Sequence, residues 1–226
     1  CYNIRMEFNK QESFYKNGLL VIDNFLPQDL ALEIGNALMI SEDFEQVEQV
    51  RTRHYKTFLK TDFPNFPLED ENYFANFKKN TEVITKEPEL FQRFQENVKK
   101  KLNELADGSL QFYTKPLCYK MSEGDQIRLH KDLYAGEVGY TIYLTNHWCW
   151  DWGGIFNFYS PIDDQMLQIM PKFNRIVFRN ESVKLFHFVS PVTPYAKLDR
   201  VSINGWGATE DKSEELKNKS IGEYSE

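Results

Sequence analysis

The sequence predicts an α+β fold whose core is a double-stranded β-helix, or jelly roll, with N-terminal helices packed on one of its sheets. Three observations support this class. Apolar residues recur at helical spacing in the first half of the 226-residue chain. From Leu110 onward, eight short β-type runs alternate with turn residues, as in jelly rolls. Aromatic residues make up 15% of the chain, which suits a sheet-rich core.

The N-terminal part predicts a short apolar strand over Leu19–Ile22, followed by a helix that begins near Pro27. The buried stripe of this helix is predicted to comprise Leu30, Ala31, Ile34 and Leu38. Residues 41–86 are polar and aromatic by turns and contain Pro64 and Pro67, so we expect a loop region there, with one helix around residues 68–79.

A second helix is predicted to begin at Pro88 and to end at Gly108, which suits a C-terminal cap. Its apolar residues follow helical spacing: Leu90, Phe91, Phe94, Val98, Leu102 and Leu105. The whole chain, residues 1–226, is interpreted as one domain. It has a helical part over about 19–108, a jelly-roll part over about 110–207 and a charged, mobile tail over 208–226.

Composition argues against several classes of protein. The net charge of −7 makes nucleic acid an unexpected partner, and no apolar run is long enough for a membrane span. The three cysteines form no CxxC motif and are read as free thiols of a reducing compartment, so a cytoplasmic location is expected. The start shows no signal-peptide layout, and because it lacks an initiator Met we expect a trimmed chain.

His130 and Asp132 interrupt the β-type run "QIRLHKD". Residues two apart on a strand point to the same side, so this imidazole and carboxylate face one spot. Alone, they are equally well explained as a salt bridge, or as an Asp that fixes a histidine tautomer. His187, on a later β-type run, supplies a second imidazole. Two imidazoles and one carboxylate form the facial triad that holds non-haem Fe(II).

Arg200 lies thirteen residues after His187, in an alternating run that puts Arg200, Ser202 and Asn204 on one face. A metal-chelating dicarboxylate needs a fixed cation for its far carboxylate, and arginine supplies a bidentate one. Arg200 would otherwise be an ordinary ion-paired residue. The polar face it shares favours an occupied interior.

Three stretches together resemble the Fe(II)/2-oxoglutarate-dependent dioxygenases, in their prolyl 4-hydroxylase-like branch: "YKMSEGDQIRLHKD", "YTIYLTNHWCWDWGGIFNF" and "HFVSPVTPYAKLDRVSINGW". The stretch "VIDNFLPQDLALEIGNAL" is similar to the family's N-terminal strand and helix, so the resemblance covers roughly residues 19–207. Departures from the family pattern are an inserted Thr145, Ile155 after the Gly pair, and a long gap between His187 and Arg200.

The resemblance implies a role for individual residues. His130, Asp132 and His187 would bind iron and carry the catalysis. The predicted cosubstrate site comprises Arg200 and Tyr143 at the distal carboxylate of 2-oxoglutarate, with Tyr119 and Ser202 beside them. Trp206 would line the pocket. The implied cofactors are Fe(II), 2-oxoglutarate and O₂, with ascorbate as a candidate reductant.

The implied activity is hydroxylation of an unactivated C–H bond with release of succinate and CO₂. The substrate could be a prolyl residue of a peptide, or a free amino acid or other small metabolite. The alternatives left open are a non-catalytic jelly-roll binding module, a zinc-dependent hydrolase using the same three residues, and a nucleic-acid demethylase. His54 and His147 are interpreted as loop histidines, and the 146–152 loop as core packing or, alternatively, a substrate anchor.

Overall fold

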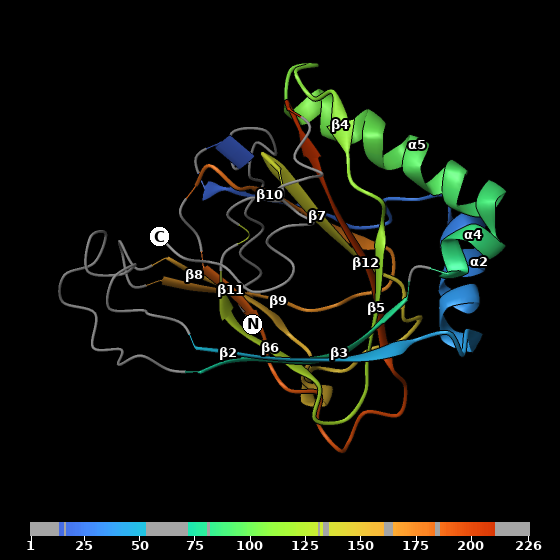
Figure 1. The fold of residues 1–226 in the computed structure, drawn as a ribbon, viewed down its shortest axis with the longest axis vertical. Helices are drawn as coiled ribbons and strands as arrows, with labels where there is room; N and C mark the ends of the chain where they lie inside the picture. The colour runs from blue at the N-terminus through green and yellow to red at the C-terminus, as the bar shows by residue number, and fades with distance from the viewer. Residues whose placement is uncertain are drawn as a thin grey trace, which may run out of the picture.

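The computed structural model describes residues 14–210 except residues 16, 53–71, 81, 131, 133–135, 161–164 and 184–185. It is an α+β fold, mostly of antiparallel strands, with its longer helices outside the sheet (Figure 1). The helices are α2 (Gln28–Ile40), α4 (Glu82–Lys86) and α5 (Pro88–Leu105), with a 3₁₀ turn η1 at Trp150–Trp152. The strands are β1 (Leu19–Ile22), β2 (Glu45–Thr52), β3 (Asn72–Asn80), β4 (Phe112–Tyr113), β5 (Leu117–Met121), β6 (Gln126–His130), β7 (Val138–Tyr143), β8 (Phe156–Ser160), β9 (Gln165–Ile169), β10 (Arg175–Asn180), β11 (Phe186–Val189) and β12 (Arg200–Ala208).

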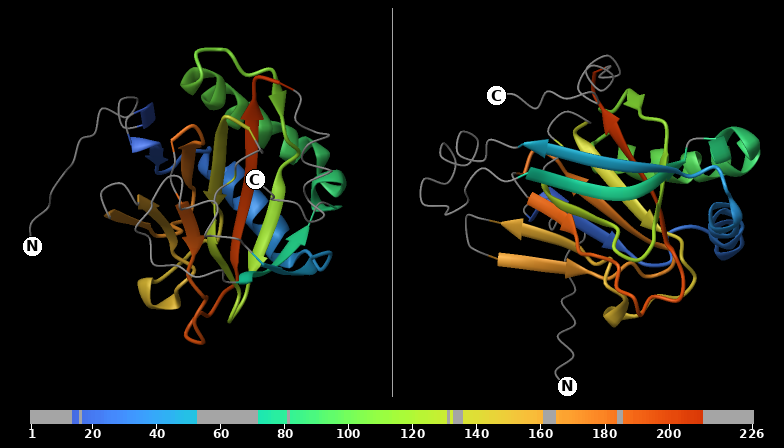
Figure 2. Two further views of the ribbon diagram at one scale, coloured as in Figure 1. Left: turned by 60° about the vertical axis from the view of Figure 1, so that its left-hand side comes forward. Right: turned by 60° about the horizontal axis from the view of Figure 1, so that its bottom comes forward.

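The strands form a sheet that folds over on itself. Its order is β1-β10-β7-β12-β5-β3-β6-β11-β8-β9, with β2 added to β3 and β4 to β12. Strand β3 is the corner, because Lys78–Asn80 pair with β5 whereas Ala75 and Asn76 pair with β6. The two halves of the sheet therefore face each other, as a jelly roll requires (Figure 2).

Helices α2 and α5 cover the outer face of the half that contains β5, β12 and β7 (Figure 1). Helix α5 begins with Pro88 at its first turn, and Gly108 follows its end at φ 75°, donating its N–H to the carbonyl of Asn103. Phe94 of α5 meets Tyr140 of β7 at 6.2 Å between ring centroids. The predicted stripes of both helices are buried in this outer core, apart from Leu90, which is half-buried.

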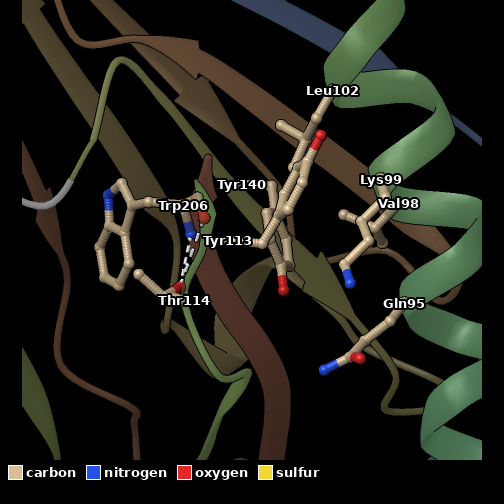
Figure 3. A pocket seen from close by; sticks show the side chains of 8 residues that line it. All are labelled: Gln95, Val98, Lys99, Leu102, Tyr113, Thr114, Tyr140 and Trp206. Atoms are coloured by element: carbon tan, nitrogen blue, oxygen red, sulfur yellow. Dashed lines mark hydrogen bonds between the residues drawn. The ribbon is translucent and has the colours of Figure 1, made fainter. Parts of the chain in front are cut away.

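Strand β12 separates the outer core from the interior of the roll. Val201 and Ile203 belong to the core cluster under the helices. Arg200 and Ser202 face the opposite way, toward Met121 and Tyr143 of the interior cluster. Figure 3 shows the outer and inner faces of the sheet near Trp206, farther along β12. The ring of Tyr140, on the neighbouring strand β7, lies toward α5, whereas the indole of Trp206 lies on the opposite face. The small pocket drawn in Figure 3 therefore lies between α5 and the outer face of the sheet.

Two predictions within residues 41–86 are wrong. Glu45–Thr52, expected to lie in a loop region, forms strand β2. The helix expected around residues 68–79 is instead strand β3, Asn72–Asn80, which pairs along its length with β2. The run "NYFANFKKN" has strand-favouring aromatic residues, and its pairing with β2, β5 and β6 outweighs its weak helical spacing. The predicted loop around Pro64 and Pro67, like His54, lies outside the described residues.

The remaining boundaries agree closely with the predicted ones. The first strand spans Leu19–Ile22 as expected, and β12 continues to Ala208, one residue beyond the predicted jelly-roll part. The tail from residue 211 onward lies outside the described residues. Within the described part of the chain, no helix combines the length and apolar character needed to cross a membrane.

Candidate metal centre

Neighbouring strands bring His130 and His187 together. Strands β6 and β11 are antiparallel partners, and His187 lies directly opposite His130, with 4.2 Å between the ring centroids. Asp132 follows two residues after His130, and its carboxylate oxygens lie 3.6 Å from Nε2 of His130 and 3.4 Å from Nε2 of His187. One ligand atom from each of the three residues lies within 4.8 Å of the others, so the group could hold a metal ion.

Local contacts orient both rings. Nδ1 of His130 lies 2.8 Å from the carbonyl oxygen of Arg128. Since a carbonyl only accepts, Nδ1 carries a proton, and in the neutral ring Nε2 keeps its lone pair toward the cluster. His187 is buried against the rings of Phe156 and Phe158, at 5.5 and 5.8 Å between centroids. The apolar wall limits water at one side of the cluster.

The carboxyl group of Asp132 stays ionised. Burial alone would raise its pKa, but His187, His130 and Arg179 together hold the pKa of Asp132 well below its usual range. An ionised carboxylate supplies a hard oxygen ligand, and the two imidazoles supply nitrogen ligands of intermediate softness. This combination suits Fe(II), Mn(II) or Zn(II) more than a soft metal.

Arg200 is a buried cation without a carboxylate partner among the described residues. Its side chain is 2% exposed. Nη1 donates only to weak acceptors, Sδ of Met121 and Oγ of Ser202, both at 3.4 Å, and Nε donates to none. An unpaired buried charge is costly, and burial accordingly lowers the pKa of Arg200. Among the described residues, the arrangement leaves Arg200 able to bind an anion.

Tyr143 lies beside this cation. The guanidinium carbon of Arg200 is 4.9 Å from the Tyr143 ring centroid, and the buried Tyr143 hydroxyl has no hydrogen-bond partner. Burial raises the pKa of Tyr143 to about 12, so the hydroxyl keeps its proton and can donate it to a ligand. Gly154 makes room for Arg200, because a Cβ at that position would lie 2.8 Å from Cδ of Arg200.

The strand register gathers the other predicted residues at the same place. Ser202 of β12 is paired with Tyr143 of β7 on one side and with Tyr119 of β5 on the other. Ser202 is 1% exposed, and Tyr119 packs against the interior core cluster. The four residues predicted at the cosubstrate site therefore lie together on the half of the sheet that faces the His130 strand, with Arg200, Tyr143 and Ser202 buried and Tyr119 partly buried.

The structure adds one residue that sequence reasoning missed. Arg179 of β10 is 4% exposed and donates to Oδ2 of Asp132 at 3.0 Å. Alternation along β10 could have identified it, because Arg179 lies two residues after the inward-facing Val177 in an otherwise hydrophobic strand. The 146–152 loop buries Trp148 and Trp152 in the core, as one reading predicted, and leaves His147 and Trp150 exposed.

Comparisons with known proteins agree with this arrangement. Residues 117–208 match the family model of the 2OG-Fe(II) oxygenase superfamily. No curated protein matches the sequence. Among solved structures, a prolyl hydroxylase from Trichoplax adhaerens, in complex with a hypoxia-inducible-factor peptide fragment, is similar at a TM-score of 0.65 and 16% identity, covering 90% of this chain and 89% of that one.

Two further solved structures share the fold. A prolyl-4-hydroxylase from Pseudomonas putida is similar at a TM-score of 0.56 and 14% identity, over 88% of this chain and 96% of that one. The α-ketoglutarate-dependent epimerase SnoN from nogalamycin biosynthesis is similar at 0.59 and 10% identity, over 87% and 80%. The resemblance read from the sequence is therefore confirmed: residues 117–208 carry the 2OG-Fe(II) oxygenase pattern, on the jelly-roll fold of solved 2OG-Fe(II) oxygenases.

Proposed function

We propose that the protein is an Fe(II)- and 2-oxoglutarate-dependent dioxygenase that hydroxylates an unactivated C–H bond. His130, Asp132 and His187 would be the iron ligands. The observation that carries the proposal is Arg200, a buried cation that lacks an acid partner among the described residues and faces the same interior as those three residues. A zinc hydrolase has no need of such a residue, whereas a dicarboxylate cosubstrate requires it.

The residues present fit the groups that the family implies. The hydroxyl of Tyr143 and Nε of Arg200 are buried donors without partners, and both suit the distal carboxylate of 2-oxoglutarate. Tyr119 and Ser202 complete this site on the neighbouring strands. When bound, Fe(II) and 2-oxoglutarate supply O₂ activation coupled to oxidative decarboxylation, which releases succinate and CO₂.

The chain's own residues orient and protect the reactants. Arg200 fixes the cosubstrate's far carboxylate through a charge-assisted contact, and Tyr143, neutral because burial raises its pKa to about 12, donates the second hydrogen bond. Phe156 and Phe158 keep water from the His187 side of the centre. These contacts hold the reactants in place, which is the protein's main contribution in cofactor chemistry.

A peptide containing a prolyl residue is the first substrate candidate. The prolyl hydroxylase from Trichoplax adhaerens was solved with a peptide bound, and its fold is similar to this one. A free amino acid or small metabolite is the second candidate, because the same fold also serves the epimerase SnoN. A mass-spectrometric screen of lysate for products that have gained one oxygen atom separates the two.

The metal and cosubstrate assignments can be tested without knowing the substrate. Wild-type protein should bind Mn(II), and with Fe(II), ascorbate and 2-oxoglutarate it should form succinate slowly. Asp132→Ala and His187→Ala should lose both properties, whereas the control His147→Ala, an exposed histidine elsewhere, should lose neither. Metal-dependent hydrolysis without any need for 2-oxoglutarate would instead identify a zinc hydrolase, and absence of metal uptake would identify a binding module.

A further inference from the structure

Arg179 connects the candidate metal centre to the opposite half of the sheet. It lies on β10, next to β7, yet its Nη2 donates to Oδ2 of Asp132 at 3.0 Å. Its guanidinium carbon lies 5.8 Å from the ring centroid of Phe156 and 6.0 Å from that of Trp206. The side chain therefore crosses the interior of the roll between two aromatic rings and ends at a predicted metal ligand.

Each of the three guanidinium nitrogens has a partner. Nε donates to Oε1 of Glu181, Nη1 to Oγ1 of Thr141 and Nη2 to Asp132, all at 3.0 Å. The hydroxyl of Thr141 in turn donates a hydrogen bond to Oδ1 of Asn204 at 2.6 Å. Because these contacts come from three separate places in the chain, the guanidinium plane cannot turn without breaking at least one of them. Arg179 is held as a rigid support for Asp132.

The backbone leaves room for this side chain. Gly139 lies directly opposite Arg179 in the β7–β10 ladder. A Cβ at Gly139 would lie 2.5 Å from Nη2 of Arg179 and 2.3 Å from Oε1 of Glu181, and real side chains cannot approach that closely. A side chain at position 139 would therefore displace the ends of Arg179 and Glu181 from this arrangement.

The charges also fit a role beside a metal. A lone guanidinium at 3.0 Å from Asp132 would repel a divalent cation. Glu181 forms a second ion pair with Arg179, and the side chains of Arg179 and Glu181 are only 5% and 13% exposed. When both carboxylates are ionised, they and the guanidinium carry a net charge of −1, and the ligand carboxylate is fixed without losing its attraction for the metal.

We propose that Arg179 is a positioning residue that fixes the carboxylate of Asp132 for metal binding, with Glu181 offsetting its charge and Gly139 providing its space. The inference rests on the proposed metal site. Outer contacts to metal ligands commonly contribute ten- to a hundredfold to metal affinity. We therefore expect a loss of about tenfold in Mn(II) affinity when the support is removed.

The charge-neutral double variant Arg179→Met/Glu181→Gln tests this most cleanly. It should bind Mn(II) about tenfold more weakly than wild type, and its Co(II) complex should show an altered visible absorption spectrum, which reports ligand geometry. Glu181→Gln alone should weaken Mn(II) binding but keep the wild-type Co(II) spectrum, since Arg179 still holds Asp132. Arg179→Lys should recover part of the affinity.

A second route leaves every polar group in place. Gly139→Ala should displace Arg179 and reproduce the altered Co(II) spectrum, and it serves if the double variant fails to fold. Thermal unfolding identifies variants that are merely misfolded. If the double variant and Gly139→Ala both keep wild-type Mn(II) affinity and Co(II) spectrum, Arg179 does not position Asp132. If the wild type itself binds neither ion, the proposed metal site is wrong, and this inference fails with it.

Discussion

Replacing Arg200 by Met should have opposite effects on the free and on the ligand-bound protein. In the free protein Arg200 is 2% exposed and has only two weak acceptors, at 3.4 Å. Replacing buried charges by apolar side chains of similar volume often stabilises proteins by about 1–4 kcal/mol. One kcal/mol corresponds to about 2–4 °C in a domain of this size. Arg200→Met should therefore unfold several degrees above the wild type when no ligand is present.

The bound state should show the reverse. At a concentration of 100 times its Kd, 2-oxoglutarate with Mn(II) should stabilise wild type by about 2.7 kcal/mol through linkage. Removing one partner of a buried charge pair costs about 3–5 kcal/mol because the other charge is left unpaired, so Arg200→Met should show almost none of this shift. Differential scanning fluorimetry, with and without 2-oxoglutarate, measures both effects.

The matched control is Arg175→Met on β10. Arg175 is paired with Asp23 at 2.6 Å and its side chain is 21% exposed, so it should keep the full 2-oxoglutarate shift and show no stabilisation without ligand. If Arg200→Met lowers the melting temperature of the free protein and still responds to 2-oxoglutarate as wild type does, Arg200 is neither a costly unpaired charge nor the partner of the cosubstrate.

Three further substitutions test other parts of the account. The hydrogen bond from Arg175 lowers the pKa of Asp23, so this carboxylate stabilises the fold above pH about 4 and less as the pH falls. The free energy of unfolding, measured by urea denaturation, should therefore fall less between pH 7 and pH 3 in Asp23→Asn than in wild type, by under about 1 kcal/mol. Lys120→Met should cost about 1–3 kcal/mol, since two carbonyls at the end of α2 lose their buried donor. Gly154→Ala should weaken 2-oxoglutarate binding while Mn(II) binding stays unchanged, because the new Cβ displaces Arg200.

Each of these three predictions would be contradicted by a specific result. A pH profile of Asp23→Asn parallel to that of wild type would mean that this ion pair contributes nothing to acid sensitivity. Unchanged stability of Lys120→Met would show that the two carbonyls find other donors. Equal losses of metal and 2-oxoglutarate affinity in Gly154→Ala would point to general disorder of the interior rather than a local clash with Arg200.

Local patterns were sufficient for most of the fold. Helices α2 and α5 were predictable because each places its apolar residues at helical spacing and begins at or just after a proline. The strands from β5 to β12 were predictable because each is a short β-type run that ends at turn residues. Alternation on β12 also predicted that Arg200 and Ser202 share a face.

Elements that depend on distant partners were not predictable in this way. Strand β3 is stabilised by pairing with β2, β5 and β6, and the local sequence pattern does not predict these three pairings. Arg179 was missed for the same reason. Its inward position follows from alternation, but its contact with Asp132 arises only when the two halves of the sheet face each other. The glycine opposite it becomes informative only once the β7–β10 register is known.

The central claim is that one ferrous ion and one 2-oxoglutarate share the interior of the roll. Crystals grown anaerobically with Mn(II) and 2-oxoglutarate test this most directly. We expect an anomalous difference peak at bonding distance from His130, Asp132 and His187, with the far carboxylate of 2-oxoglutarate on Arg200 and Tyr143. A metal bound elsewhere, or a 2-oxoglutarate molecule that leaves Arg200 without an acid partner, would contradict it.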